Sequence, residues 1–180
     1  MRHLSFAMAF IVGAFAASAV PAAGQRSIHI GIAGGAVLPV GILSDGYQDG
    51  PSGLVTLAVG SQDAPMGLRL DYQYAGFKGK TVAGTRIGDM HVNSITANLV
   101  VPFRVGYVKP YLIGGAGFYP LRFAGAAKRE NDWGANGGAG IGFELPYTTL
   151  GAFLEARYHA VNRSRTSPYH FVPITFGVMF

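Results

Sequence analysis

Residues 172–180 read VPITFGVMF, and this stretch decides the fold prediction. Every second residue is large and apolar: Val172, Ile174, Phe176, Val178 and Phe180. The alternate positions are smaller and more mixed: Phe171, Pro173, Thr175, Gly177 and Met179. A period of two is typical of a strand with two different faces, and a strand that faces lipid would leave its apolar row uncovered. We therefore predict a small transmembrane β-barrel that this strand closes.

The chain begins with a segment typical of a secretory signal peptide. Arg2 precedes a run from Leu4 to Gln25 without charge, and residues 17–24 are mostly small. The apolar part of this run is shorter than the roughly 20 residues that a membrane-spanning helix needs. We predict that residues 1–24 are a cleaved signal peptide and that residues 25–180 form a single barrel domain. Three cleavage points fit equally well: after Ala19, Ala22 or Gly24.

The composition of the chain argues against several classes of protein. Hydrophobic residues make up 49% of the chain, charged residues make up 13%, and Gly occupies 27 of 180 positions, which is unusual for a soluble helical protein. Because there is no cysteine, disulfides, zinc fingers and thiol catalysis are excluded. The formal charge is +5, and loss of Arg2 leaves 13 basic against 9 acidic residues, or +4. We find no metal-binding cluster, phosphate loop or nucleic-acid signature, and predict no cofactor and no nucleic-acid partner.

Eight strand-like runs follow the signal segment. They cover about 27–38, 53–61, 66–74, 90–102, 110–121, 133–145, 150–161 and the C-terminal strand. The breaks between them alternate between long and short, as in an up-and-down barrel with tight turns at one end and longer loops at the other. The predicted fold is therefore all-β, an eight-stranded antiparallel up-and-down transmembrane β-barrel.

The run at 66–74 shows most clearly how the two faces differ, because Leu68 and Leu70 alternate there with Arg69 and Asp71. The polar faces of the runs are rich in glycine and small residues, which suits a narrow lumen, and buried charges need partners. We predict a polar network in the lumen, made of Arg69, Asp71, Gln73, Asn98, Glu144, Glu155, Arg157 and His159. The alternative is a soluble periplasmic lipid-binding barrel whose polar face points outward.

Aromatic residues gather near both ends of the predicted strands. Near the short turns lie Phe103, Tyr107, Tyr111, Phe143 and Tyr147. Near the long loops lie Tyr72, Tyr74, Phe77, Tyr119, Phe123, Trp133 and Tyr169. Amphipathic rings favour membrane–water interfaces, so we predict two aromatic belts on the outside of the barrel.

The mature chain resembles the small outer-membrane β-barrel family, typified by the OmpA transmembrane domain and OmpX within the porin family. The resemblance rests on the Gly-rich strand at 30–36, on Lys109-Pro110-Tyr111-Leu112, and on residues 153–158 and 175–180. It implies an outer-membrane location, periplasmic termini and short turns, and four longer surface loops. It also implies a monomer whose terminal Phe176, Val178 and Phe180 are read by the barrel-assembly machinery.

Basic residues outnumber acidic ones in the predicted surface loops. The basic residues are Lys78, Lys80, Arg86, Lys128, Arg129, Arg163 and Arg165. The acidic ones are Asp45, Asp49, Asp89, Glu130 and Asp132. Lipopolysaccharide phosphates would pair with Lys or Arg, so we predict lipopolysaccharide contact as well as outer-membrane lipid. The simpler alternative is that these loops are only solvated.

A structural or interaction role is the function that these features predict, with no large pore, because eight strands leave room only for side chains. The alternative is an enzyme that modifies lipid A, with His159 near Ser164 and Ser167. The family's lipid A deacylases carry a His and a Ser two apart on one strand, followed by Asn, whereas Ala160 and Val161 follow His159 here. We therefore predict that the protein is not an enzyme.

Overall fold

The computed structural model describes residues 27–60, 65–103, 108–123, 130–144, 150–163 and 167–180. The predicted signal peptide, residues 1–24, lies outside these ranges and remains a prediction.

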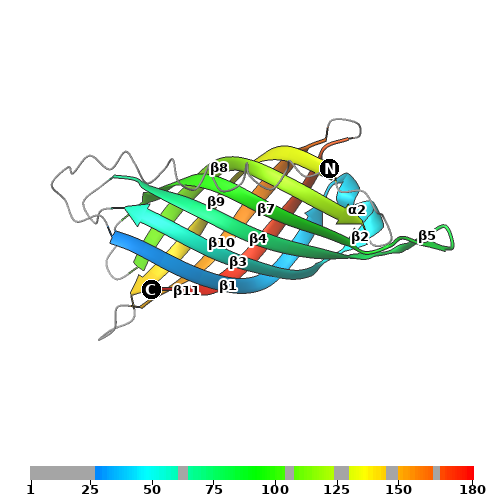
Figure 1. The fold of residues 1–180 in the computed structure, drawn as a ribbon. Coiled ribbons are helices and arrows are strands. Elements are labelled where there is room, and N and C mark those ends of the chain that lie inside the picture. The colour runs from blue at the N-terminus through cyan, green and yellow to red at the C-terminus, as the bar shows by residue number, and fades with distance from the viewer. Residues whose placement is uncertain (1–26, 61–64, 104–107, 124–129, 145–149, 164–166) are drawn as a thin grey trace, which may run out of the picture.

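Antiparallel strands wind around the molecule and close into a barrel (Figure 1). In the described part of the chain the main sheet holds nine strands, of which the two-residue β2 (Tyr47–Gln48) is an appendage, leaving eight in the wall. The wall strands are β1 (Ser27–Val40), β3 (Gly50–Gly60), β4 (Gly67–Gly79), β7 (Met90–Pro102), β8 (Val108–Phe123), β9 (Glu130–Glu144), β10 (Gly151–Asn162) and β11 (Tyr169–Met179). The first and last close the ring, with partners from Gly31↔Met179 to Val40↔His170. The predicted eight-stranded up-and-down barrel is confirmed.

Two of the predicted long breaks contain regular structure. The first holds α2 (Ile42–Gly46) and β2, and the second holds the hairpin of β5 (Thr81–Val82) and β6 (Thr85–Arg86). Ala83 and Gly84 join that hairpin, and both have positive φ, as a tight two-residue β-hairpin turn requires. Among the described residues, no helix has the length and apolar character needed to cross a membrane.

Side chains alternate strictly between the inside and the outside of the wall. Ile30 and Ile32 on β1 are 54% and 52% exposed, and Phe176 on β11 is 59% exposed. On β4, Arg69 is 4% and Asp71 is 1% exposed, while Leu70 between them is 50% exposed. The outside of the wall is thus mainly apolar, and the charged side chains of β4 and β10 lie inside, because a strand turns alternate residues to opposite faces.

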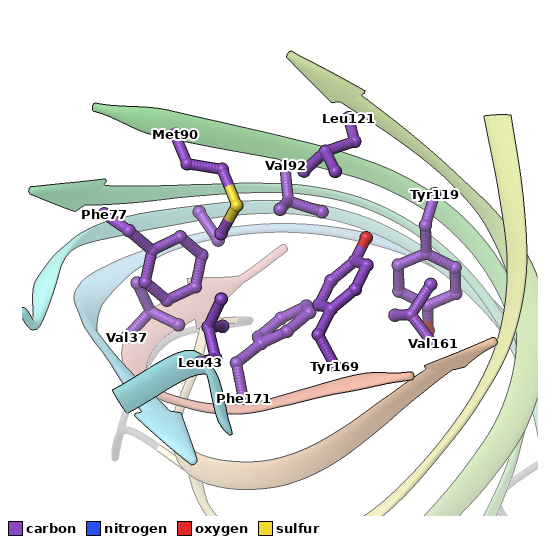
Figure 2. Close-up of a cluster of buried hydrophobic side chains, with 11 residues drawn as sticks. Val37, Leu43, Phe77, Met90, Val92, Tyr119, Leu121, Val161, Tyr169 and Phe171 are labelled. Carbon is purple, nitrogen blue, oxygen red and sulfur yellow. The ribbon is translucent and has the colours of Figure 1, made fainter. Parts of the chain in front are cut away.

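The end of the barrel that carries α2 and the β5–β6 hairpin is filled by apolar side chains (Figure 2). We call this group the mouth cluster, and its members are Val37, Leu43, Ala75, Phe77, Met90, Val92, Tyr119, Leu121, Val161, Tyr169 and Phe171. This end of the lumen is therefore largely apolar, whereas the buried Arg69, Asp71, Glu155 and Arg157 lie deeper in the barrel.

The mouth cluster corrects the prediction of two aromatic belts. Phe77, Tyr119 and Tyr169 point into the barrel, where each is at most 5% exposed. Tyr111, predicted for the other belt, also points inward, because its hydroxyl donates to buried Glu155. Phe103, Phe143, Tyr72 and Trp133 are exposed, as the belts require. Tyr107, Tyr147 and the side chain of Phe123 lie outside what the structure describes.

Candidate functional site

Four charged side chains form a closed ring in the middle of the lumen. Arg69 Nε lies 3.0 Å from Asp71 Oδ1, and Arg69 Nη2 lies 2.7 Å from Glu155 Oε1. Arg157 Nη1 lies 2.8 Å from Asp71 Oδ2, and Arg157 Nε lies 2.8 Å from Glu155 Oε1. Each cation thus touches both anions, and no member is more than 4% exposed. The formal charge of this ring, which we call the charge ring, sums to zero.

The charge ring joins opposite walls of the barrel. It is built from β4 and β10, which are four steps apart around the eight-stranded wall. Because every neighbouring pair is antiparallel, these two strands run in the same direction. Arg-x-Asp on β4 and Glu-x-Arg on β10 therefore place opposite charges at the same height: Arg69 faces Glu155, and Asp71 faces Arg157.

Neutral donors on the intervening strands add hydrogen bonds to the site. Asn98 Nδ2 on β7 donates to Asp71 Oδ2 over 3.0 Å, and Tyr111 Oη on β8 donates to Glu155 Oε2 over 2.7 Å. Asn136 Nδ2 on β9 donates to Asn98 Oδ1 over 2.9 Å. These bonds matter because a buried ion pair is favourable only when its remaining lone pairs and protons are satisfied.

Glycine on β9 makes room for these long side chains. A Cβ at Gly138 would lie 2.8 Å from Arg157 Cγ and 2.7 Å from Arg157 Cα, closer than real Cβ contacts allow. A Cβ at Gly140 would overlap the ring of Tyr111. The glycines on the inner face of β9 therefore leave the space that the side chains of Arg157 and Tyr111 occupy.

Above the charge ring, the mouth cluster and α2 fill the loop end of the barrel. Leu43 of α2 is 8% exposed and packs into the mouth cluster. Lys80 holds α2 there, since its backbone N–H donates to Gly46 O over 2.8 Å and its Nζ donates to Ser44 O over 2.7 Å. A cavity of about 430 Å³ lies beside α2, lined partly by Tyr47 and Arg163. Burial raises the pKa of the Tyr47 phenol, and the Arg163 charge opposes this rise.

The family described as "Outer membrane protein beta-barrel domain" matches residues 4–180. The chain belongs to this outer-membrane β-barrel family. No curated protein is significantly similar to it in sequence. Solved structures to which it is similar at low identity include the following three. They are Neisserial surface protein A (15% identity, covering 86% of this chain and 97% of that one, TM-score 0.61), OprG from Pseudomonas aeruginosa (14%, 87% and 98%, 0.49) and Ail from Yersinia pestis (23%, 86% and 97%, 0.49).

Membership of this family indicates what each face of the barrel contacts. The exposed apolar face is the one that meets lipid in barrels of this kind, and the inner face is polar. Five of the eight residues predicted for a lumen network are linked by the contacts already given: Arg69, Asp71, Asn98, Glu155 and Arg157. Gln73 is buried but bonds elsewhere, since its Nε2 donates to Ser52 Oγ over 3.2 Å.

Glu144 is a wrong prediction, because its side chain is 72% exposed and pairs with Lys109 at the rim. It shares the inner parity of β9 but sits at the last residue of that strand, beyond the closed part of the lumen. Tyr111 and Asn136 contribute to the site and were not predicted for it. Asn136 shares the polar side of β9 with Glu144, so its inward direction was readable from the sequence, whereas the glycines that follow Tyr111 left the direction of that side chain open.

His159 lies in the mouth cluster's aromatic layer. Its Nδ1 is 3.0 Å from Tyr119 Oη, and its ring stacks on Phe171 with centroids 4.7 Å apart. It is 0% exposed, so a lipid substrate outside the wall does not reach it. Ser164 lies outside the described residues, and Ser167 is exposed. Across the described residues, no group of three or more His, Cys, Asp or Glu side chains could hold a metal ion.

The loop cations predicted to contact lipopolysaccharide separate into three groups. Lys78 and Arg86 are exposed, whereas Lys80 is occupied in holding α2. Arg163 Nε lies 3.9 Å from Asp132 Oδ2, so that cation faces an anion of the same protein. Lys128, Arg129 and Arg165 lie outside the described residues.

Proposed function

We propose that this protein is an exported outer-membrane barrel with a structural or interaction role at the cell surface and no large pore. The observation that carries the proposal is the charge ring, which bridges opposite walls of the lumen with side chains that are at most 4% exposed. The mouth cluster is a second barrier above it. Outer-membrane lipid, including lipopolysaccharide, and the assembly machinery are the proposed partners of a monomeric barrel.

Two alternative functions fit the geometry less well. A soluble lipid-binding barrel needs an apolar interior and a polar exterior. Here the interior carries the charge ring, and the exterior carries exposed Ile28, Leu68 and Phe176. A lipid A-modifying enzyme needs a base within reach of a nucleophile and of the lipid. His159 instead stacks on Phe171 and meets the ring of Tyr119 edge to face, inside the barrel.

The proposed function predicts that the protein fractionates with the outer membrane, shifts in SDS gels on boiling, and gives no steady conductance steps in planar bilayers. An eight-stranded lumen leaves space only for side chains, and here charged and aromatic groups occupy it. The gel shift on the same sample verifies that the recorded protein is folded. Porin-like steps from heat-shifting protein would refute the closed lumen, and recovery of the protein in the soluble fraction would refute the membrane role.

The C-terminal residue offers a separate test of assembly. Phe180 N donates to Ile30 O over 2.8 Å and Ile30 N donates to Phe180 O over 3.2 Å, so its backbone helps to close the barrel, while its side chain is 52% exposed. Phe180→Ser keeps those backbone bonds. We expect it to lower the amount of barrel assembled in cells several-fold while refolding in detergent stays close to normal. Leu154→Ser, at a similarly exposed position on β10, is the control, and equal assembly of both variants would contradict a signal at Phe180.

A further inference from the structure

Two cationic side chains and a histidine lie near one another on the outside of the wall, at the end that carries the loops. They are Lys78 on β4, His91 on β7 and Arg122 on β8. His91 is the cross-strand partner of Arg122 and of Gly76, and Lys78 follows Gly76 by two residues on the same face. Lys78 and Arg122 are exposed, and neither side chain has an interaction partner among the described residues. We call these three residues the outer-wall cluster.

Neighbouring side chains hold the outer-wall cluster in a defined shape. Tyr74 Oη lies 2.9 Å from His91 Nδ1, and the two rings stack with centroids 5.8 Å apart. Gly76 permits this arrangement, because a Cβ there would lie 3.0 Å from Tyr74 Oη. The contact uses Nδ1 of His91 and leaves Nε2 available. Two residues closer to the middle of the wall on each strand, Tyr72 Oη donates to Asn93 Oδ1 over 2.8 Å.

An apolar band begins directly below this polar layer. Ile95 is the cross-strand partner of both Tyr72 and Phe118, and it is 44% exposed. Leu70 and Leu99 continue the band and are each 50% exposed. From the loops toward the middle of the wall, the surface therefore changes from cationic, through hydroxyl and amide groups, to apolar. The acyl chains, sugar and phosphate of a phosphorylated glycolipid follow the same order in reverse.

We propose that the outer-wall cluster binds the phosphorylated headgroup of a lipid A-type glycolipid in the surrounding leaflet. Lys78 and Arg122 pair with phosphate oxygens, the strong charge-assisted bonds that these side chains form. His91, held by Tyr74, donates to the same headgroup, and the acyl chains lie along the band around Ile95. A soluble anion has no acyl chain that could contact that apolar band. The proposal rests on the outer-membrane function proposed above and assigns its lipid contact to the wall rather than to the loop tips.

Only Lys78 in this site belongs to the cations predicted from the loops. His91 on β7 and Arg122 on β8 lie in strands, at positions whose side chains point outward toward the lipid. Asp71 and Glu155 are neutralised inside the barrel, so they do not compete for these cations. Asp89, which directly precedes β7, accepts a hydrogen bond from Gly79 N over 3.0 Å.

The test compares Arg122→Gln with Arg86→Gln, since both remove one exposed arginine without removing a known side-chain contact. Purified barrel in detergent is titrated with diphosphoryl lipid A, and bound lipid is counted by native mass spectrometry. Loss of one charge-assisted bond predicts affinity about tenfold lower for Arg122→Gln and unchanged for Arg86→Gln. Lys78→Gln combined with Arg122→Gln should weaken binding further. Dephosphorylated lipid A should bind the parent protein as weakly as diphosphoryl lipid A binds the double variant.

Equal affinity of Arg122→Gln and Arg86→Gln for diphosphoryl lipid A would overturn the site. Equal affinity of the parent protein for phosphatidylglycerol would overturn the choice of a glycolipid. Both results leave the proposed function intact when the protein still fractionates with the outer membrane and shifts on boiling. Failure of those two assays in the parent protein would instead refute the proposed function itself.

Discussion

Arg157→Met is expected to destabilise the barrel by about 3–5 kcal/mol, the range for removing one partner from a buried ion pair. The change leaves Asp71 and Glu155 with only Arg69 between them, in a lumen where each is at most 2% exposed. The free energy of unfolding can be measured by urea titration in lipid vesicles. Trp133, the single tryptophan, reports the transition because its side chain is 70% exposed on the outer face of β9.

Two further variants isolate the electrostatic cause. Adding Glu155→Gln to Arg157→Met restores a neutral lumen, so the double variant should be more stable than the single one. Lys109→Met removes a cation from an exposed pair with Glu144 and should cost about 0–1 kcal/mol. If Arg157→Met and Lys109→Met had equal effects, the charge ring would contribute no more than a surface ion pair.

The fold was predictable because its main signal is local. On β4 and β11 every second residue is apolar, and this period appears directly in the sequence without knowledge of any partner strand. Once eight strands alternate in direction, the charge ring also follows: Arg-x-Asp on the third strand and Glu-x-Arg on the seventh face each other and run in parallel. The sequence prediction named all four residues. It did not pair them, because it did not use the position of each strand around the barrel.

The facing of individual aromatic residues was not predictable by the same reasoning. Along β8, glycines at 114, 115 and 117 interrupt the alternation, so Tyr111 and Tyr119 have no local sign of pointing inward. Phe77 lies beyond the predicted end of its strand at 74, although β4 continues to Gly79. Arg122 was missed for the same reason, since the predicted strand stopped at 121.

The short helix α2 depends on contacts that are distant in sequence. It has five residues and begins after Gly41, whose φ is 63°, without a side-chain cap. Helices this short are not stable alone. Lys80, from the next long loop, supplies the bonds to Ser44 O and Gly46 O, and Leu43 supplies the apolar contact. Local propensity therefore says little about it, and the closed mouth could only be seen in three dimensions.

Phe171 and Phe176 lie on the same strand but on opposite faces, and replacing each with alanine measures the two faces separately. Phe171 is 1% exposed, stacks on His159, and has the rings of Phe77, Tyr119 and Tyr169 within 6.5 Å. Phe171→Ala leaves a cavity in the mouth cluster and should cost about 3–5 kcal/mol.

Phe176 is 59% exposed on the lipid face. Lipid chains fill the space when this ring is removed, so Phe176→Ala should lose only transfer free energy, about 1–2 kcal/mol. Both variants are unfolded in urea in the same vesicles, with Trp133 as the reporter. A larger effect at Phe176 would mean that contact with lipid, rather than packing in the mouth, contributes most of the stability of this strand. The mouth cluster would then be too loosely packed to serve as the second barrier across the lumen.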